Sequence, residues 1–210
     1  KNLKYLNLFS RKYKKVLAFD GGGVRAIMGL YFLRKLEEES SKSIFESFDL
    51  FIGTSAGATN ALMLGMNGYK ITDLEEFWTI DNLKRIMNQS LIDKTSIFQT
   101  RPKYSNEGKI EILKKFFGNK KMGQSLKPVV VTAYDLEARK PILLSSYGDP
   151  EVTAVQAANA SSAAPIYFPT ASMESGRWLI DGGIATNNPS LLGYVEAKKL
   201  FSTNNIKVLG

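Results

Sequence analysis

The sequence contains neither cysteine nor histidine among its 210 residues. The absence of cysteine excludes disulfide bonds, a thiolate nucleophile and zinc or iron–sulfur sites with cysteine ligands. The absence of histidine excludes a Ser-His-Asp triad, an imidazole base and histidine-ligated metals. Any acid–base chemistry in this protein must therefore use carboxylates, lysine, tyrosine or water.

Long apolar runs are also missing. No stretch approaches the roughly 20 apolar residues of a membrane-spanning helix, and Leu3–Phe9 is too short and too interrupted for the apolar part of a secretion signal. We therefore expect a single domain that resides in the cytoplasm or at the periphery of a membrane. The first residue is not methionine, and residues 206–210 read as a strand that is just beginning. We expect the natural chain to extend beyond both ends.

Positive charge is in excess, because 28 lysines and arginines against 20 aspartates and glutamates give a net charge of +8. Such a protein attracts anionic partners, among them lipid headgroups, nucleic acids and acidic proteins. Nucleic acid is not predicted, because no motif interleaves aromatic and basic residues. We expect a basic segment over residues 1–14 either to remain solvated or to hold the protein on an anionic membrane surface. The basic residues at this end are Lys1, Lys4, Arg11, Lys12, Lys14 and Lys15.

Short apolar runs alternate with amphipathic stretches, which predicts an α/β fold with a mostly parallel central sheet covered by helices on both faces. The predicted strands are residues 15–19, 48–52, 128–133, 140–144, 178–180 and 206–210. The predicted helices are residues 26–39, 56–66, 109–117, 149–159 and 188–200, with a further helix opened by residues 72–75. Core positions are predicted for Met28, Phe32, Met63 and Met66, and the alternative is that they line a groove for an acyl chain.

The pentapeptide Gly53-Thr54-Ser55-Ala56-Gly57 lies directly between a predicted strand and a predicted helix. This is the strand–turn–helix context of a G-x-S-x-G nucleophile elbow, in which a tight turn needs glycine on both flanks of the serine. Attack by Ser55 would create an oxyanion that the backbone amide of Ala56 can stabilise. An ordinary glycine-containing turn is the alternative.

A second glycine-rich loop, Asp20-Gly21-Gly22-Gly23-Val24-Arg25, follows the first predicted strand. Its amides can converge on an anion, and Arg25 adds a positive charge. A dinucleotide site would need an acid at the end of the next strand, whereas Asp49 lies inside that strand. The lysine-serine or lysine-threonine pair of a P-loop is missing. An oxyanion hole therefore fits better than a nucleotide site, and a turn without a ligand is the remaining alternative.

The third motif, Asp181-Gly182-Gly183, follows the predicted strand at residues 178–180. Asp181 is thus placed at a strand end, where active-site residues of α/β sheets gather. Because histidine is absent, a serine nucleophile needs another base, and a carboxylate is the natural choice. Asp181 is the best placed candidate and Asp135 is the second. Asp20 is expected to cap the amides of its own glycine loop.

These three motifs, in this order, resemble the signatures of the patatin-like phospholipase family: an Asp-Gly-Gly-Gly-x-Arg loop, a Gly-x-Ser-x-Gly elbow and an Asp-Gly-Gly or Asp-Gly-Ala turn. Residues 160–165 and 187–189 look like further landmarks of the family. The resemblance covers residues 15–200. One departure is Ala26, where many members carry glycine, and this small residue is expected to leave the loop intact.

The resemblance implies a patatin-like catalytic domain over residues 15–210 that hydrolyses phospholipids or other acyl-ester lipids without a metal ion or cofactor. It assigns Ser55 as nucleophile, Asp181 as base and Gly21, Gly22 and Gly23 to the oxyanion hole. Arg25 would orient the loop, meet a lipid phosphate or form a salt bridge at a helix start. The alternatives are a neutral-lipid lipase or transacylase with the same dyad, and a non-catalytic module that binds lipid or a partner.

Overall fold

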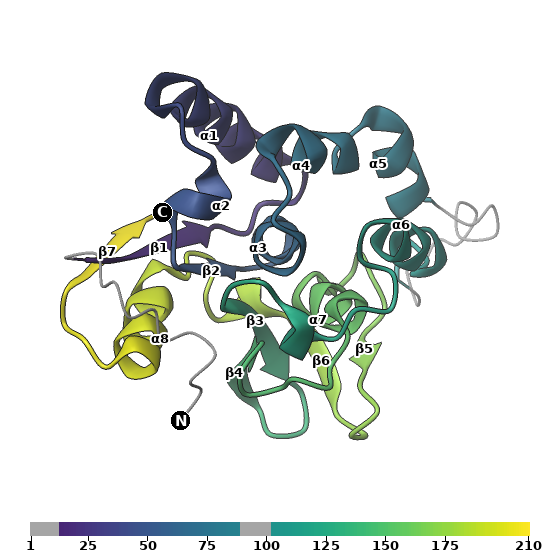
Figure 1. Ribbon diagram of the computed structural model, residues 1–210. Helices are drawn as coiled ribbons and strands as arrows, with labels where there is room; N and C mark the ends of the chain where they lie inside the picture. Colours follow the sequence, from purple (N-terminus) through teal and green to yellow (C-terminus); the bar gives the residue numbers. More distant parts are fainter. Residues whose placement is uncertain (1–12, 89–101) are drawn as a thin grey trace.

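The computed structural model describes residues 13–88 and 102–210, whose strands form one seven-stranded sheet with helices packed against it (Figure 1). The strands are β1 (Lys14–Phe19), β2 (Leu50–Gly53), β3 (Val129–Asp135), β4 (Lys140–Ser145), β5 (Ala171–Ser172), β6 (Trp178–Asp181) and β7 (Ile206–Leu209). The helices are α1 (Ala26–Ser40), α2 (Ile44–Ser47), α3 (Ala56–Asn67), α4 (Ile71–Phe77), α5 (Ile80–Ile86), α6 (Glu107–Phe117), α7 (Ala154–Ser161) and α8 (Ser190–Phe201).

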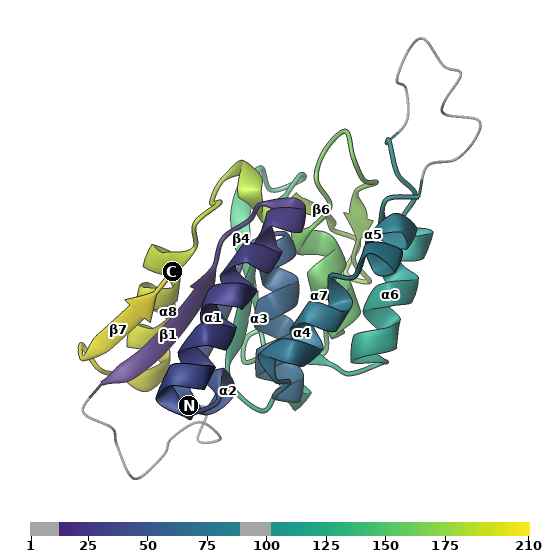
Figure 2. The same ribbon diagram turned by 90° about the horizontal axis from the view of Figure 1, so that it is seen from above.

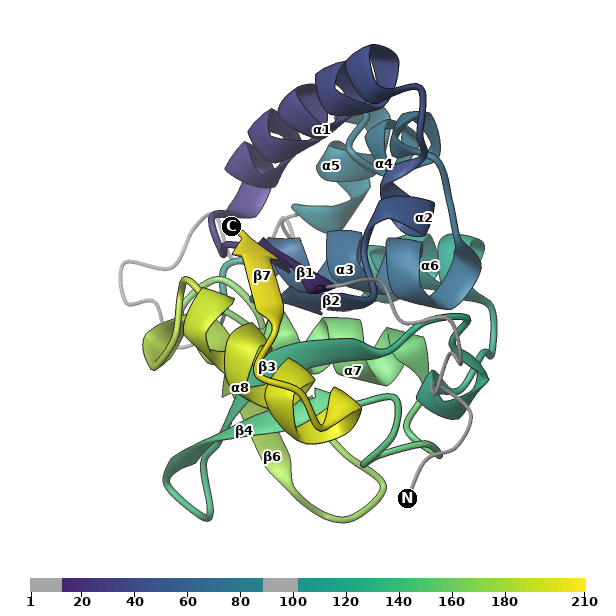
Figure 3. The same cartoon turned by 60° about the vertical axis from the view of Figure 1, so that its left-hand side comes forward.

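The sheet is mixed, with the strand order β5-β6-β3-β2-β1-β7 and β4 paired to β3. Strands β7, β1, β2 and β3 are parallel neighbours, whereas β4 and β6 run antiparallel to β3, and β5 runs antiparallel to β6. Figure 3 views the sheet with β7 in front, β1 and β2 behind it, and β3, β4 and β6 below. The expected α/β fold is confirmed. Its antiparallel part, which begins with the β3–β4 hairpin, is an addition to the mostly parallel sheet that the sequence predicts.

The two edges of β3 are used differently. Strand β4 pairs along one edge, so β2 and β6 share the other edge. Gly53 at the end of β2 lies opposite Val131, and Asp181 at the end of β6 lies opposite Ala133. Val131 and Ala133 are about 7 Å apart along the strand. The carboxyl ends of β2 and β6 therefore meet, although they are far apart in the sequence.

Both faces of the sheet are covered by helices. Helix α3 packs on β1, β2 and β3 from one side, and α8 packs on β1, β2 and β7 from the other (Figure 1). Figure 2 shows α1, α3, α4 and α6 running alongside one another on the α3 side. On the opposite face α8 approaches closely at Gly193, where a Cβ atom would come within 2.8 Å of Ile52. The expected cover on both faces is confirmed.

Helix α3 is buried on all sides, since every residue from Ala56 to Met66 is buried. Its small residues allow this, and Gly65 lies so close to β3 that a Cβ atom there would approach the Cβ of Val129 to 2.8 Å. A helix without a solvent-exposed face needs no polar stripe, which explains why most of its residues are apolar, with Thr59 and Asn60 as buried polar exceptions. The residue that precedes this helix, Ser55, is consequently anchored to the centre of the fold.

One predicted helix start is wrong. The sequence Asp149-Pro150-Glu151 looks like the beginning of a helix, yet α7 begins at Ala154 with Thr153 as its N-cap. The Thr153 hydroxyl accepts a hydrogen bond from the amide of Gln156, and the Gln156 side chain accepts one from the amide of Thr153. This reciprocal capping box satisfies two amides at once. The Asp149 carboxylate instead accepts a hydrogen bond from the amide of Ser145 within a turn.

Two of the residues assigned to the core are on the surface. Met63 and Met66 are buried as expected, whereas Met28 and Phe32 on α1 have 67% and 59% of their surface exposed. They lie four residues apart and so share one side of α1, and Leu30 and Leu33 provide its buried side. Among the described helices, none is long and apolar enough to cross a lipid bilayer.

Most of the basic segment at residues 1–14 lies outside the described residues, as does most of the expected irregular stretch at residues 89–105. Lys14 opens β1, and its ammonium lies 3.5 Å from the Asp49 carboxylate. The Asp49 side chain also accepts a hydrogen bond from the amide of Lys15. Asp49 thus helps to hold the start of the first strand.

Candidate active site

Ser55 occupies a strained turn between β2 and α3. Its backbone has φ 56° and ψ −124°, a conformation that few residues with a side chain adopt. Its amide donates a hydrogen bond of 2.9 Å to the hydroxyl of Ser161, at the end of α7. The turn is strained, as expected of a nucleophile elbow, and it is held by a contact from a distant element.

The two glycines of the pentapeptide are needed because backbone passes close to them. A Cβ atom at Gly53 would collide with the carbonyl of Gly57. A Cβ atom at Gly57 would come within 2.5 Å of the carbonyl oxygens of Phe19 and Asp20, where β1 ends. The glycine spacing therefore brings the turn of Ser55 against the beginning of the glycine-rich loop.

The structure brings Ser55 and Asp181 together, as the sequence predicts. The Ser55 hydroxyl Oγ donates a hydrogen bond of 2.6 Å to Asp181 Oδ2, across 126 positions of sequence. The other carboxylate oxygen, Oδ1, accepts a hydrogen bond of 2.7 Å from the amide of Gly183. This second contact fixes the orientation of the carboxylate, so that Oδ2 remains directed at the serine.

The environment of Asp181 favours a carboxyl group that binds protons readily. Burial raises the pKa of Asp181, while the hydrogen bonds from Ser55 and Gly183 and the positive charge of Lys109 oppose this rise. A carboxylate with a raised pKa is a stronger base than an exposed one. The geometry and the electrostatics of this pair are those expected of a nucleophile and its general base.

The two other aspartates considered from the sequence lie elsewhere. The carboxylate of Asp135 accepts hydrogen bonds from the amides of Glu137 and Ala138, and thereby closes the turn between β3 and β4. Asp20 is exposed, and within the described residues its side chain makes no hydrogen bond, so the expected cap of the glycine loop is wrong. The carbonyl of Asp20, rather than its carboxylate, lies next to Gly57.

Some backbone amides of the glycine-rich loop are hydrogen-bonded within the protein, and others are not. The amide of Gly21 donates to the carbonyl of Asn187 at 3.0 Å and is therefore not available to a substrate, which corrects its assignment to an oxyanion hole. The amides of Gly22, Gly23 and Ala56 have no hydrogen-bond partner within the described part of the chain. Gly23 has φ 58°, which favours glycine.

Arg25 supports the glycine-rich loop. Both its backbone amide and its Nε donate hydrogen bonds to the carbonyl of Gly22, at 3.2 and 3.4 Å. Among the described residues it forms no salt bridge, so the salt-bridge role is not seen, while its two hydrogen bonds to Gly22 fit the orientation of the loop. Contact with a lipid phosphate stays a prediction.

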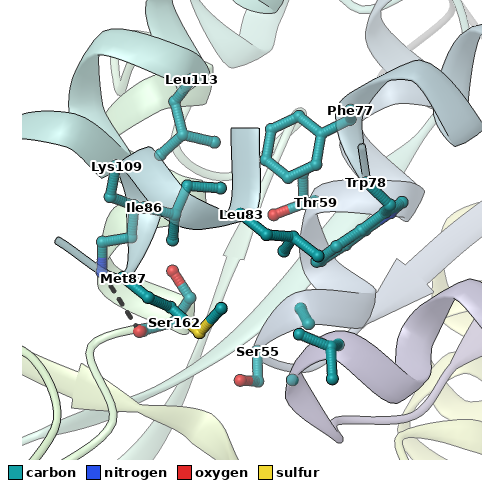
Figure 4. Close-up of a pocket in the computed structure, with 13 residues that line it drawn as sticks. Ser55, Thr59, Phe77, Trp78, Leu83, Ile86, Met87, Lys109, Leu113 and Ser162 are labelled. Carbon is teal, nitrogen blue, oxygen red and sulfur yellow. Dashed lines mark hydrogen bonds between the residues drawn. The ribbon is translucent and has the colours of Figure 1, made fainter. Parts of the chain in front are cut away.

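An apolar pocket opens beside Ser55 (Figure 4). Gly23, Ser55 and Ala56 are among the residues that line it, so the nucleophile candidate, the glycine-rich loop and the start of α3 border the same cavity. Its remaining walls come mainly from α4, α5 and α6. The apolar side chains that line it are Phe77, Trp78, Leu83, Ile86, Met87 and Leu113. A pocket of this character suits an apolar chain attached to the group that reacts at Ser55.

Two residues of the site carry no functional prediction from the sequence. Ser161 belongs to the landmark at residues 160–165, which signals its position but not its contact with Ser55. Lys109 lines the pocket and looks, in sequence, like any lysine of an amphipathic helix. Within residues 13–88 and 102–210, no three acidic side chains come together in a group that could hold a metal ion.

Fold and site together define an α/β protein with a serine at a strand-to-helix turn, an aspartate bonded to it and a glycine loop beside both. The sequence profile of the patatin-like phospholipase family matches residues 17–192, and the chain belongs to this family.

Individual relatives agree with this membership. Patatin-like protein 4 of Arabidopsis thaliana is 31% identical, over 90% of this chain and 52% of that protein. Calcium-independent phospholipase A2-gamma of Homo sapiens is 29% identical, over 89% of this chain and 26% of that protein. The chain thus spans about half of the plant relative and a quarter of the human one. Among solved structures, VipD from Legionella pneumophila shares the fold, with a TM-score of 0.64 at 14% identity over 95% of this chain and 50% of that chain.

Proposed function

We propose that this protein is a lipid acyl hydrolase of the phospholipase A type, in which Ser55 is the nucleophile and Asp181 is the general base. The observation that carries the proposal is the 2.6 Å hydrogen bond from Ser55 Oγ to Asp181 Oδ2, beside an apolar pocket. Membership of the patatin-like phospholipase family supports an acyl hydrolase that acts on lipids. The absence of histidine from the sequence supports a carboxylate as the base.

In the first half of the reaction, Ser55 Oγ attacks the carbonyl carbon of a fatty-acyl ester and transfers its proton to Asp181. The carbonyl oxygen becomes an oxyanion, which the amides of Gly22, Gly23 and Ala56 stabilise. The tetrahedral intermediate then expels the alcohol of the lipid, and Asp181 returns the proton to this leaving group. The product is an acyl-enzyme on Ser55.

In the second half, water enters and Asp181 removes a proton from it as it attacks the acyl-enzyme. The same amides stabilise the second oxyanion, and Ser55 leaves as the protonated hydroxyl. The Gly183 amide keeps Asp181 in place through both halves, since it binds the oxygen that does not exchange the proton. The released fatty acid departs from the apolar pocket.

The surface around the pocket supports a lipid aggregate as the source of substrate. Val24 and Met87 line the pocket and are exposed, and Met28 lies one helical turn beyond Val24. Apolar side chains at the mouth of a pocket can enter the edge of a bilayer. The net charge of +8 adds attraction to anionic headgroups. We therefore propose a peripheral membrane association, to which the basic segment at residues 1–14 contributes.

The test measures fatty-acid release from mixed phosphatidylcholine and phosphatidylglycerol vesicles by the wild type, Ser55→Ala and Asp181→Asn. Each variant should lose about a thousandfold or more in kcat, since each removes an indispensable partner of the dyad. Ser175→Ala, which changes an exposed serine, is the matched control and should retain full activity. A fluorophosphonate probe should label the wild type but not Ser55→Ala.

Equal release by the wild type and both dyad variants would contradict the proposal. A substrate panel tests its finer part. If triacylglycerol emulsions are cleaved much faster than phospholipid vesicles, the phospholipase assignment is replaced by that of a neutral-lipid lipase with the same dyad.

A further inference from the structure

Lys109 on α6 is a buried lysine that the mechanism above does not use. Only 4% of its surface is exposed, and it lines the pocket beside Ser55 (Figure 4). Its Nζ donates a hydrogen bond of 3.2 Å to the carbonyl of Ser162 and lies 4.1 Å from the centre of the Phe168 ring. Burying an ammonium group next to an apolar cavity costs stability. Such a group is therefore a candidate for a functional role.

The carbonyl that Lys109 binds belongs to the segment that holds the dyad. The hydroxyl of Ser161 accepts the hydrogen bond from the Ser55 amide. The carbonyl of Ala163 accepts a hydrogen bond of 3.1 Å from the amide of Asp181. Ser162 lies between these two contacts. Lys109 thus ties α6 to the segment through which both dyad residues are positioned.

We propose that Lys109 is a positioning residue of the active site, whose ammonium group fixes the segment at Ser161–Ala163 and favours the ionised form of the Asp181 carboxylate. The proposal rests on the function proposed above, because it concerns the charge of the general base. Lys109 does not exchange protons with the substrate. It acts through Asp181 and through the backbone of Ser162.

The charges around the pair support this electrostatic role. The carboxylate of Asp181 favours the charged form of Lys109, and Lys109 in turn favours the ionised form of Asp181. Helices α3 and α7, which pack on α6, contain no charged residue. Arg85 on α5 forms an exposed ion pair with a glutamate of α6, and Lys103 lies over the ring of its neighbour Tyr104. Asp135 on β3 binds the backbone of its own turn. Among the described residues, Asp181 is the charged group whose attraction acts on the Lys109 ammonium.

The proposal gives a characteristic pH profile. Burial lowers the pKa of Lys109 to about 7, although the Asp181 carboxylate counteracts this. Activity should rise with pH as Asp181 loses its proton. It should fall again near pH 7 as Lys109 becomes neutral, not to zero but to the activity of an enzyme without this charge. The plot of activity against pH is therefore bell-shaped, with a plateau of residual activity on the alkaline side.

The experiment compares the wild type with Lys109→Met and Lys109→Arg on a soluble, uncharged short-chain ester, so that membrane binding does not enter. Below pH 7, Lys109→Met should lose about tenfold in kcat with little change in KM, which corresponds to the loss of one modest interaction with the transition state. The acidic limb of its pH profile should move to higher pH, because Asp181 loses the positive charge that favours its ionised form. Lys109→Arg retains the charge at all these pH values, so it should restore the acidic limb and abolish the fall near pH 7.

The controls separate this proposal from simpler explanations. Lys114→Met changes an exposed lysine of the same helix and should leave the profile unchanged. Lys109→Met removes a buried charge, and a thermal melt should show that it remains folded. An unchanged acidic limb in Lys109→Met, or an alkaline fall that persists in Lys109→Arg, would overturn the proposal. So would an unchanged kcat of Lys109→Met on this ester together with a loss on vesicles of anionic phospholipid, since it would mean that Lys109 binds headgroups. If the wild type and Ser55→Ala hydrolyse the ester at the same rate, this result contradicts the proposed function and does not bear on the role of Lys109.

Discussion

Individual glycines in this protein have different roles that depend on what lies next to each Cα atom. Gly57 is the second residue of α3, and a Cβ atom there would approach two carbonyl oxygens at the end of β1 to 2.5 Å. Gly29 in α1 has nothing within 4 Å of the corresponding position. Both residues are helical, so helix propensity alone treats their replacement by alanine as favourable.

We expect Gly57→Ala to destabilise the protein by about 3 kcal/mol, because the backbone of β1 must move to admit the methyl group. Gly29→Ala should be neutral or stabilise by up to about 1 kcal/mol, since it gains helix propensity without a clash. Urea unfolding followed by circular dichroism measures both values. Equal stability of the two variants would mean that β1 does not restrain the turn of Ser55.

At the scale of elements, the site depends on where helix α7 ends. Its last residue, Ser161, accepts the hydrogen bond that holds the amide of Ser55 at 2.9 Å. The segment that follows binds the amide of Asp181 and the ammonium of Lys109. The end of α7 therefore serves as a common support for residues from three other elements.

Replacement of Ser161 by alanine tests this support. The Ser55 amide would lose its partner at a backbone conformation that is already strained, so the hydroxyl would be less well directed at the substrate. We expect kcat to fall about tenfold, with KM changed less than twofold, as for an interaction that matters mainly in the transition state. Steady-state kinetics on a soluble ester gives both values. A variant with unchanged kcat would show that α3 and β2 hold the turn without help.

The same elements show what the sequence can and cannot predict. The positions of Ser55 and Asp181 follow from glycine spacing and strand ends, which are local signals. The Gly21 amide is occupied by the carbonyl of Asn187, and Lys109 is buried where α6 packs against α7. Both facts depend on residues far away in the sequence, so the local sequence around Gly21 or Lys109 does not predict them. The helical period places Met28 and Phe32 on the same side of α1, but it does not say which side of the helix faces the core.

For the molecule as a whole, the proposed membrane association can be tested on exposed apolar residues of α1. Met28 and Phe32 share one side of α1 and are largely exposed. If this side enters the edge of a bilayer, the double variant Met28→Asp/Phe32→Asp should bind vesicles more weakly. Burial of such a side chain contributes about 1.5–3 kcal/mol to the free energy of binding. The release of fatty acid from vesicles by the double variant should therefore fall tenfold or more. Vesicle sedimentation and fatty-acid release measure the two effects.

A soluble ester provides the comparison for this surface. It reaches Ser55 without a bilayer, so the double variant should cleave it at a rate close to that of the wild type. A Lys35→Glu/Glu38→Lys variant is a matched control, because it exchanges an exposed ion pair of the same helix and keeps the net charge. Equal losses on vesicles and on the soluble ester would instead point to damage inside the domain.

The arrangement of β3, which pairs with β2 at one end and with β6 at the other, has a consequence for biosynthesis. The nucleophile emerges from the ribosome 126 positions ahead of its base, and the two meet only when β6 has joined the sheet. Under the proposed mechanism, a nascent polypeptide is unable to hydrolyse lipid until translation has passed β6. On this proposal, the topology delays the hydrolysis of lipid until β6 has been added to the sheet.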